Sequence, residues 1–379
     1  MGEPENSNRI QGFIFACKKK TEGECLESLI FGSDKTYAPV VIKIKVGDIL
    51  FLHNLETHVV YGIFKAISNG NKNIQPSLWG GKYPFQVKVE LIGKLCTIDD
   101  SILGKYGIVQ NRTIVGKKLA STINSFLKDD ADNKDFMKKY SNIIKAIDPS
   151  ETEVEIPIIE ATTLWDFPRQ SYGVTKKGDN KYSGVTPALI IYNLIWRYTE
   201  IGELVVDPMC GSGTTIDVCK EEKRESIGLD ICPPRRDEVQ SDARSIPLKD
   251  SVADMIFVDS PYGDNIKYNE KSGCLCNISS QKNEFYDELE RIMVESKRVL
   301  KKDKIIAWLI GDQWLKNKFT PVGLNVYQRI GRHFQPIEII CVSRRGQSSN
   351  TRIWTNRARK NNFYLRGFKY LIIARKVRD

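Results

Sequence analysis

The chain has 379 residues, of which 41% are hydrophobic and 27% charged, and its formal net charge is +10. This length and composition predict a globular protein of two domains, and a membrane-spanning helix is excluded because no run of about eighteen apolar residues occurs. The N-terminus is polar and lacks the apolar core of a signal peptide, so we expect a cytoplasmic protein.

Short runs of β-forming residues fill residues 10–97, and clusters of Gly, Asn, Asp and Pro separate them. Short strands with frequent turn signals are typical of a small β-barrel. We therefore predict such a barrel over residues 1–97, with one helix near residues 22–29. The expected strands lie at residues 12–16, 40–44, 48–54, 59–67 and 85–92.

Residues 98–160 are more helical in pattern and highly charged. Within them, residues 128–157 predict a charged helix followed by an exposed linker. We place the main domain boundary in this linker, which makes residues 98–160 a helical, charged connector.

From residue 161 to residue 379, apolar strands alternate with amphipathic helices. Continuous apolar strands between helices indicate an α/β fold with a largely parallel sheet that is covered on both faces. The last two strands have no helical pattern between them, so we expect them to close the sheet as an antiparallel pair. The expected strands lie at residues 203–207, 226–230, 253–259, 304–312, 338–345 and 368–376.

The strand at residues 203–207 leads into a turn with two glycines and then into a helix. Gly211 and Gly213 allow a tight turn, and open α/β sheets bind ligands in the crevice beside such a turn. A phosphate-binding loop requires a lysine after the second glycine, but two threonines follow it here. A dinucleotide-binding turn requires a third glycine, where this chain has Ile216. The remaining cofactor class is a nucleoside with a cationic sulfonium tail.

Acidic residues stand at or just after the ends of the first three strands of this sheet. Asp207 would place negative charge near the sulfonium, Asp230 would accept hydrogen bonds from two ribose hydroxyls, and Asp242 would bind the adenine amino group. Acids at strand ends also cap helices or lie in loops, but three in succession favour a cofactor site.

The fourth strand ends in the tetrapeptide Asp259, Ser260, Pro261 and Tyr262. The exocyclic amine of cytosine or adenine is a poor nucleophile because its lone pair is delocalised into the ring. Hydrogen bonds to the Asp259 carboxylate and to the Ser260 backbone carbonyl would favour a pyramidal nitrogen, while Pro261 fixes the turn. The Tyr262 ring would stack on a base that has left its helix. These residue types also form ordinary turns, but the strand-end position favours catalysis.

Two of these motifs resemble those of the amino-methyltransferases, a superfamily that includes DNA adenine-N6 and cytosine-N4 enzymes and several tRNA and rRNA enzymes. The motifs are DPMCGSGTT at residues 207–215 and DSPY at residues 259–262, and the resemblance covers residues 161–379. It implies a Rossmann-like, seven-stranded methyltransferase sheet and S-adenosylmethionine as the cofactor. Ser260 replaces the proline that is usual in the family, and it contributes mainly a backbone carbonyl. We therefore expect catalysis to survive, although the motif then distinguishes adenine from cytosine less well.

The resemblance also implies which residues contact the cofactor. Residues 165–173 and 184–200 are similar to the segment that, in cytosine-N4-type enzymes, closes over the methionine end of the cofactor. Together with the turn and the acids, the implied cofactor-binding residues are Trp165, Phe167, Thr186, Pro187, Asp207, Met209, Gly211, Gly213, Thr214, Thr215, Asp230 and Asp242.

Residues 12–92 bear a second, weaker resemblance to a DCD-type domain of the PUA-like barrel superfamily. Its relatives bind RNA or modified bases, which implies that this barrel binds nucleic acid. We expect the aromatic residues Phe51, Trp79 and Phe85 to build the barrel rather than to contact a ligand.

A basic segment without acids lies between the last two strands, at residues 344–369. Trp354, Phe363 and Tyr364 alternate with its cations, and such a mixture would bind phosphates and stack on bases. A solvated loop is the alternative. The predicted nucleic-acid-binding residues are Arg344, Arg345, Arg352, Arg357, Arg359 and Lys360.

The nine cysteines are scattered from Cys17 to Cys341, and only three histidines are present. An odd, scattered set argues against a disulfide framework. Zinc sites usually have two closely spaced ligand pairs, whereas the tightest pair here is Cys274 and Cys276. We therefore predict no metal site.

The basic composition favours nucleic acid as the partner, because contacts with phosphates dominate the affinity of proteins for nucleic acid. Residues 161–379 contain no separate region for reading base edges, as sequence-specific DNA enzymes have. We therefore favour methylation of cytosine N4 in structured RNA such as rRNA. The alternatives are a DNA cytosine-N4 or adenine-N6 methyltransferase and a non-catalytic reader of modified nucleic acid.

Overall fold

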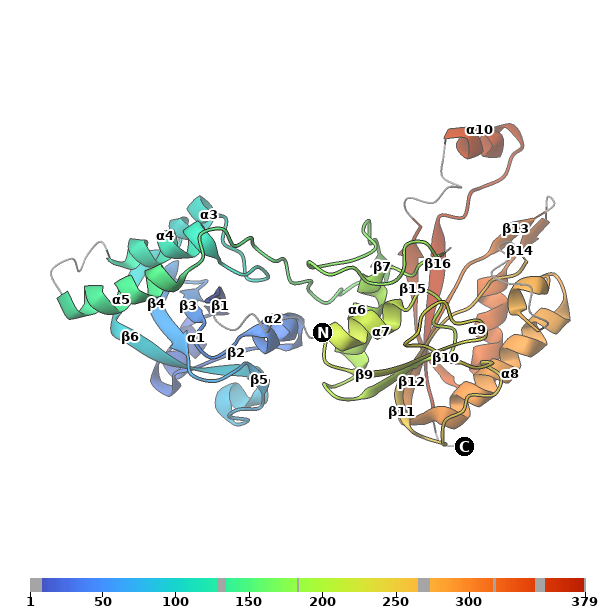
Figure 1. Ribbon diagram of the computed structural model, residues 1–379, viewed down its shortest axis with the longest axis horizontal. Coiled ribbons are helices and arrows are strands. Elements are labelled where there is room, and N and C mark those ends of the chain that lie inside the picture. The colour runs from blue at the N-terminus through green and yellow to red at the C-terminus, as the bar shows by residue number, and fades with distance from the viewer. Residues whose placement is uncertain are drawn as a thin grey trace. The chain divides into compact units, whose positions relative to one another are not determined.

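The computed structural model describes residues 9–127, 134–182, 184–264, 273–315, 318–344 and 352–377. The chain forms two compact units, residues 1–159 and residues 160–379, whose elements are labelled in Figure 1. None of the helices in the described ranges is both long enough and apolar enough to cross a membrane.

The first unit is built on a curved sheet of six strands that nearly closes into a barrel (Figure 1). The longest strand, β6, pairs with β2 on one side and with β4 and β5 on the other. The pair of β1 and β3 is parallel, and the other pairs are antiparallel. The predicted barrel is therefore confirmed. Its strands are β1 (Gly12–Cys17), β2 (Ile30–Ser33), β3 (Ile49–Asn54), β4 (Val59–Ala66), β5 (Asn71–Lys72) and β6 (Phe85–Asp99).

The strand predicted at residues 40–44 is wrong, because helix α2 (Ala38–Lys43) occupies this segment. Pro39 stands in the first turn of α2, where its fixed φ suits a helix and its missing N–H costs no hydrogen bond. Val40 and Val41 are buried from this helix. The β-branched residues that suggested a strand thus pack in the core of the unit from a helix.

Helices α3, α4 and α5 pack on the barrel instead of forming a free connector. Leu119, Ile123 and Phe126 of α4 lie in one hydrophobic cluster with Phe51, whose ring stacks on that of Phe126 with centroids 5.5 Å apart. Ile156, in the segment predicted as an exposed linker, is fully buried. Residues 98–159 therefore share a unit with the barrel. The helices of this unit are α1 (Lys19–Ser28), α2, α3 (Ser101–Tyr106), α4 (Gly116–Leu127) and α5 (Lys134–Ala146), with short 3₁₀ turns at Lys35–Tyr37 and Leu78–Gly81.

The second unit contains an eight-stranded sheet in the order β10-β9-β8-β11-β12-β16-β15-β7. The strands from β10 to β12 are parallel, whereas β16 is antiparallel to both of its neighbours. The predicted fold class and the antiparallel pair of final strands are confirmed, and β7 adds an eighth strand to the seven expected. The strands are β7 (Leu164–Trp165), β8 (Leu204–Asp207), β9 (Glu225–Asp230), β10 (Val239–Gln240), β11 (Ala253–Asp259), β12 (Leu300–Ile310), β15 (Gln335–Ser343) and β16 (Phe368–Arg375).

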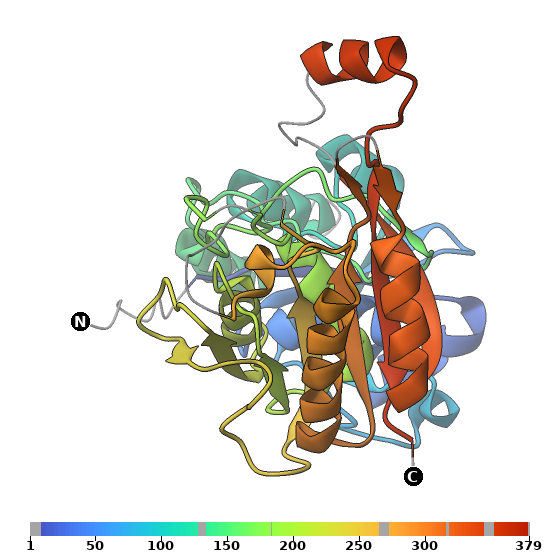
Figure 2. The same cartoon turned by 90° about the vertical axis from the view of Figure 1, so that its right-hand side faces the viewer.

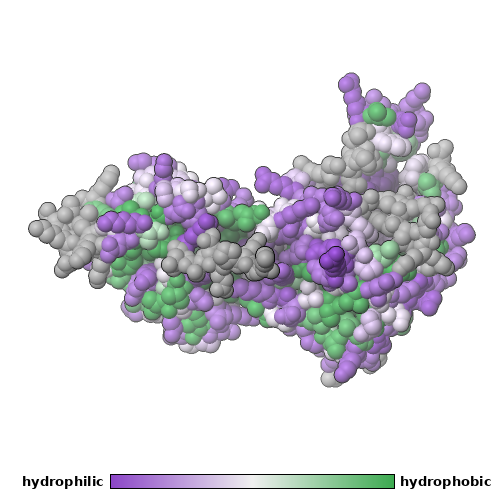
Figure 3. All heavy atoms as spheres, in the orientation of Figure 1, coloured by the Kyte–Doolittle hydropathy of each residue, from purple (hydrophilic) through white to green (hydrophobic). Residues whose placement is uncertain are grey.

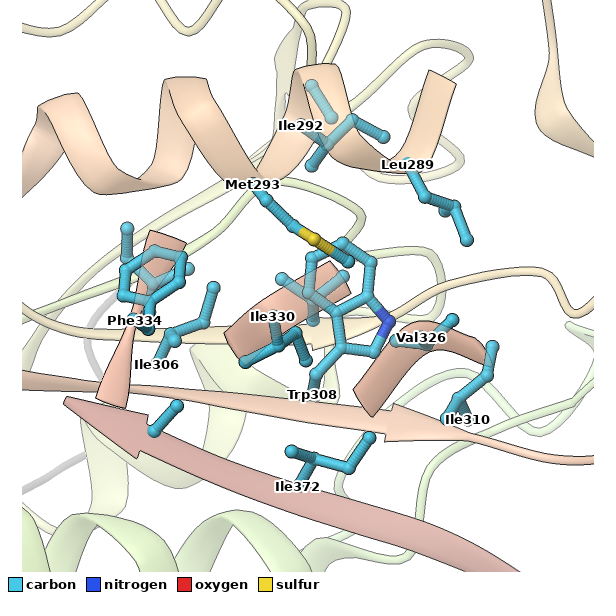
Figure 4. Packing of buried hydrophobic residues seen from close by; sticks show 14 of the residues in the cluster. Leu289, Ile292, Met293, Ile306, Trp308, Ile310, Val326, Ile330, Phe334 and Ile372 are labelled. Atoms are coloured by element: carbon cyan, nitrogen blue, oxygen red, sulfur yellow. The ribbon is translucent and has the colours of Figure 1, made fainter. Parts of the chain in front are cut away.

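Helices cover both faces of this sheet, with α6 and α7 on one face and α8 and α9 on the other (Figure 1). The core between the sheet and α8 and α9 contains Trp308 of β12, whose indole rises from the strand toward Met293 of α8 (Figure 4). The helices are α6 (Ala188–Tyr198), α7 (Thr214–Glu221), α8 (Asn283–Val299), α9 (Val322–His333) and α10 (Arg352–Lys360), with a 3₁₀ turn at Leu275–Asn277 and a hairpin of β13 (Gln313–Leu315) and β14 (Lys318–Thr320).

A helix was not expected between the last two strands, yet α10 lies there. In both views it stands clear of the sheet, beyond the end at which β15 finishes and β16 begins (Figures 1 and 2). The described residues of α10 are almost all exposed, and only Ala358 is buried. It is a charged surface helix with three cations in its last turn. A helix of this kind buries almost no apolar residues, so the sequence contains no apolar pattern from which to predict it.

Candidate active site

A cavity of about 670 Å³ opens in the second unit at the carboxyl ends of the parallel strands. The turn after β8, the end of β9 and the loop after β11 all line it, together with the segment that precedes α6. In an open α/β sheet this edge is where ligands bind. The turn predicted for the cofactor and the loop predicted for catalysis therefore face one shared cavity.

The turn after β8 is held by Asp207, which is buried and does not line the cavity. Its carboxylate accepts hydrogen bonds from the backbone N–H of Met209 at 3.1 Å and from the hydroxyl of Thr215 at 2.5 Å. Burial raises the pKa of Asp207 to about 7, against these two hydrogen bonds, which lower it. The residue thus stabilises the turn from behind the cavity wall.

The two glycines of the turn serve different purposes. Gly211, with φ at +53°, lines the cavity, and its N–H donates to an Asp230 carboxylate oxygen at 3.2 Å. Gly213, with φ at +76°, does not line the cavity, and a Cβ there would collide with the Arg235 guanidinium. Gly213 therefore makes room for a side chain of the protein.

The predicted cofactor residues divide into two groups. Seven of them line the cavity: Phe167, Thr186, Pro187, Met209, Gly211, Asp230 and Asp242. Five lie behind its wall, at positions that support the first group: Trp165, Asp207, Gly213, Thr214 and Thr215. Trp165, for example, is buried on β7 and packs against Phe167 with ring centroids 5.7 Å apart.

The cavity has features that fit an adenine nucleoside. Asp230 keeps acceptor capacity toward the cavity, since each carboxylate oxygen binds only one of the backbone N–H groups of Gly211 and Cys232. Asp242 also lines the cavity, but both of its oxygens bind Arg244, at 2.5 to 2.9 Å. Apolar residues that suit a purine ring line the same cavity, namely Ile231, Ala243, Leu275 and Ile292. A volume of about 670 Å³ is within the range of small-molecule sites.

All four residues of the predicted catalytic loop line the cavity. Asp259 ends β11, and one of its carboxylate oxygens accepts a hydrogen bond from the Thr186 hydroxyl at 2.6 Å. This contact joins the segment before α6 to the catalytic loop, so Thr186 contacts the predicted catalytic acid as well as the cavity. The sequence contains no pattern that pairs these residues, which are 73 positions apart.

Ser260 departs from the usual proline and has a definite partner. It is buried, and its hydroxyl oxygen accepts a hydrogen bond from the indole N–H of Trp308 at 3.0 Å. Trp308 is fully buried in the core beneath the loop (Figure 4). The serine side chain therefore satisfies a buried donor that a proline would leave without an acceptor.

Two cations flank Tyr262. The Arg344 guanidinium lies 5.8 Å from the centre of the Tyr262 ring and donates to its hydroxyl at 3.3 Å. The Lys369 ammonium lies 5.7 Å from the same ring and forms an ion pair with Asp259, with N–O distances of 3.1 and 3.3 Å. By its position in the sequence, Lys369 belongs to the basic segment at residues 344–369. Its place in the cavity could have been predicted from the expected antiparallel last strand. The first residues of such a strand lie at the edge of the sheet where the parallel strands end.

The predicted nucleic-acid-binding residues do not form a single cluster. Arg344 lies in the cavity, whereas Arg345 is outside the described residues. The others lie on α10, and Figure 3 shows hydrophilic side chains around this helix. On α10 the Arg357 guanidinium lies 5.0 Å from the ring centre of Trp354, which is 41% exposed. The four α10 cations are Arg352, Arg357, Arg359 and Lys360.

The chain also contains side chains of the types that bind metal ions. Across the described ranges, no group of three or more His, Cys, Asp or Glu side chains is arranged to hold a metal ion. The nine cysteines are free thiols.

Comparisons with known proteins identify two families along the chain. Residues 11–113 match the family model of the development and cell death domain, and residues 114–240 match that of the DNA methylases. The DCD domain-containing protein NRP-B of Glycine max is 41% identical over 87 residues, which cover 21% of this chain and 26% of that protein. The type II methyltransferase M.MjaII of Methanocaldococcus jannaschii is 40% identical over 57 residues, which cover 15% of this chain and 11% of that protein.

Among solved structures, TrmN from Thermus thermophilus is similar with a TM-score of 0.36 at 14% identity, over 52% of this chain and 50% of that one. The [4+2]-cyclase SpnF has a TM-score of 0.36 at 15% identity, over 51% of this chain and 82% of that one.

The chain therefore contains a development and cell death domain followed by a domain of the DNA methylase family. The family model that matches residues 114–240 is that of methyltransferases that act on DNA. The matches cover well under half the length of the two curated relatives named above, at 26% and 11%. The methylase match ends at residue 240, so the role of Asp259 rests on the geometry of the cavity.

Proposed function

We propose that this protein transfers a methyl group from S-adenosylmethionine to the N4 amine of cytosine in structured RNA, such as rRNA, in the cytoplasm. The observation that carries the proposal is the shared cavity, in which the Met209–Gly211 turn and the carboxylate of Asp259 face the same space. A cofactor at the turn and an amine at the acid would then be neighbours, and such positioning supplies much of the rate of a methyl transfer.

The residues of the chain would activate the amine by hydrogen bonding. Asp259 accepts one amine N–H, and the backbone carbonyl of Ser260 accepts the other, so the nitrogen becomes pyramidal and regains its lone pair. Thr186 fixes one Asp259 oxygen at 2.6 Å. Tyr262 lines the same cavity and supplies a face on which the base stacks.

Bound S-adenosylmethionine would supply an electrophilic methyl group: the S–CH3 bond would be exchanged for an N–CH3 bond as the sulfonium becomes a neutral thioether, and the amine would release one N–H proton to Asp259 or to water. The chain would hold it with the carboxylate of Asp230 at the ribose hydroxyls and with the apolar wall at the adenine. The buried Asp207 lies behind the turn, and in its ionised form it would favour a cationic sulfonium over the neutral product.

Three observations support RNA as the substrate. The described residues of the second unit contain no additional domain for reading base edges, and the one accessory domain precedes the methylase. RNA loops also present bases that are already unstacked, which lowers the energy needed to bring one into the cavity. Helix α10 offers four cations and an exposed tryptophan for phosphates and bases.

The test is methyl transfer from radiolabelled S-adenosylmethionine to RNA and to DNA, each purified from cells that lack the protein. We expect label in RNA as N4-methylcytidine, identified by mass spectrometry of nucleosides, and none with Asp259→Ala. The Asp259→Ala variant should still bind S-adenosylmethionine in calorimetry. Turnover by this variant near that of the wild type would show that the amine is activated elsewhere.

A DNA substrate is the second candidate, because the matching family is that of the DNA methylases and one relative is a type II methyltransferase. Cytosine N4 or adenine N6 in DNA would use the same cavity chemistry. Label confined to DNA, at one short sequence, would establish this alternative and exclude RNA. A non-catalytic reader of modified nucleic acid would instead show no S-adenosylmethionine binding in calorimetry.

A further inference from the structure

Lys369 lies at the active site because of the direction of its strand. It is the second residue of β16, which runs antiparallel to β12. The start of β16 therefore lies at the edge of the sheet where β11 and β12 end. There the Lys369 ammonium is 3.1 and 3.3 Å from the two carboxylate oxygens of Asp259, and both side chains are largely buried, at 14% and 13% exposed.

This ion pair places a hydrogen-bond donor directly beside the proposed acceptor for the target amine. The Lys369 ammonium also lies 5.7 Å from the centre of the Tyr262 ring, so donor and acceptor both lie close to the ring on which the base would stack. Lys369 lines the cavity. A base bound at Asp259 would therefore present its neighbouring ring atom to Lys369.

The chemistry of the bases makes this pair selective. In cytosine and adenine, the carbon that carries the exocyclic amine also adjoins a ring nitrogen with a free lone pair, N3 or N1. The amine donates and the ring nitrogen accepts, which complements an acid beside an ammonium. In guanine the neighbour on the pairing edge is N1–H, a donor, and the lone-pair neighbour N3 lies on the edge beside the sugar. A guanine whose pairing edge faces the ion pair would therefore offer the ammonium no acceptor at this position.

We propose that Lys369 reads the ring nitrogen next to the target amine and so restricts the site to cytosine or adenine. The proposal rests on the amine methylation put forward above and adds a residue that selects the base. Before the base arrives, the ammonium pairs with Asp259. Its long, flexible side chain then lets it move the short distance to the ring nitrogen while Thr186 keeps its hold on Asp259.

The chain offers a matched control on the same strand. Lys301 forms an ion pair with Asp254 at 2.8 and 2.9 Å, and Asp254 lies at the start of β11, whereas Asp259 lies at its end. The substitution Lys301→Met removes a contact between a lysine and the other aspartate of β11, at the opposite edge of the sheet, and leaves Asp254 paired with Lys304 at 3.3 Å. If losing an ion pair had a general effect on activity, it would appear in both variants. A change in the response to the ring nitrogen should appear only in Lys369→Met.

The experiment is a double-mutant cycle in which Lys369 is replaced in the protein and the ring nitrogen is replaced in the substrate. After mass spectrometry has mapped the methylated nucleotide, oligonucleotides spanning it are made with the natural base or with its deaza analogue, 3-deazacytidine or 1-deazaadenosine. The analogue replaces the ring nitrogen by C–H and makes the amine more electron-rich. A lower rate on the analogue therefore reflects a lost hydrogen bond rather than a weaker nucleophile.

We expect wild type and Lys301→Met to lose about 10- to 100-fold in kcat/KM on the analogue, the range for a specific base contact. Lys369→Met should have a lower kcat/KM than the wild type on the natural base. Its own kcat/KM should differ by less than about threefold between the natural base and the analogue. Calorimetry with S-adenosylmethionine checks that each variant remains folded.

Three outcomes would overturn the inference. They are an equal loss on the analogue in Lys369→Met and wild type, no loss in wild type, and a mapped target at guanine N2. Each of these leaves amine methylation standing. Absence of any methylated base would remove the proposed function itself, and with it the role of Lys369.

Discussion

The hydrogen bond between Ser260 and Trp308 allows a quantitative test of why the catalytic loop carries a serine. The substitution Ser260→Ala removes the only side-chain acceptor that the structure shows for the indole N–H of Trp308, at 3.0 Å. Trp308 is fully buried and Ser260 nearly so, at 0% and 2% exposed, so water does not replace the lost acceptor. The donor is then left unsatisfied inside the core.

A buried donor without a partner costs about 1–3 kcal/mol. We therefore expect Ser260→Ala to lower the free energy of unfolding by that amount, and the melting temperature by about 2–4 °C per kcal/mol for a unit of this size. Ser260→Pro, which restores the usual family residue, should cost at least as much because it also lacks the acceptor. In a Trp308→Phe background the cost of Ser260→Ala should nearly vanish, since no donor remains.

The assay is urea unfolding of the four proteins of this cycle, followed by fluorescence and circular dichroism. Ser296→Ala is the control. Ser296 is also a buried serine of the second unit, but its hydroxyl has no hydrogen-bond partner among the described residues. Its loss should therefore not lower the free energy of unfolding and should raise it by up to about 1–3 kcal/mol. Equal costs for the two serine substitutions, or an undiminished cost in the Trp308→Phe background, would refute the reasoning.

Three further predictions concern the cofactor, pH and nucleic acid. Asp230→Ala should weaken S-adenosylmethionine binding about 10- to 100-fold in calorimetry, because two hydrogen bonds to the ribose are lost; unchanged affinity would exclude Asp230 as the ribose acceptor. Burial raises the pKa of Asp207 to about 7 from 3.8 in the unfolded chain, so its favourable contribution is full below pH 3.8 and is lost as pH rises to 7. The stability of wild type relative to Asp207→Asn should therefore fall between pH 4 and 7 in urea unfolding, by at most about 1.4 kcal/mol per pH unit, and a flat difference would contradict the shift. Combined Arg357→Ala and Arg359→Ala should reduce the slope of log Kd for nucleic acid against log salt by about 1.4 to 1.8, and an unchanged slope would remove α10 from the interface.

The strand pattern and the short-range motifs of the second unit could be predicted from the sequence. The apolar runs that became β8, β9, β11 and β12 are continuous because both faces of the sheet are covered, and this burial leaves a clear signal. Residues that follow such strands come together at one edge, so the turn at Gly211 and the loop at Asp259 were predicted together from local order alone.

Other features depended on contacts between distant segments. Residues 40–44 have the composition of a strand, yet residues 40–43 form part of helix α2, in which Pro39 suits the first turn and Val40 and Val41 are buried. Asp207 and Asp230 look alike in sequence, yet only Asp230 lines the cavity. Which acid faces the ligand depends on where the turn after β8 directs each side chain, and composition carries no signal of that.

The sequence by itself determined the class of fold and predicted the positions of the glycine turn at Gly211 and of the tetrapeptide that begins at Asp259, because periodic burial and backbone geometry act over a few residues. Only the tertiary structure decided the partners of that tetrapeptide. Thr186, Trp308 and Lys369 reach it from three other segments, 73, 48 and 110 residues away from their contacts. Hydrogen bonds and ion pairs of this kind depend on the strand order and on the antiparallel direction of β16, which arise when the whole sheet assembles.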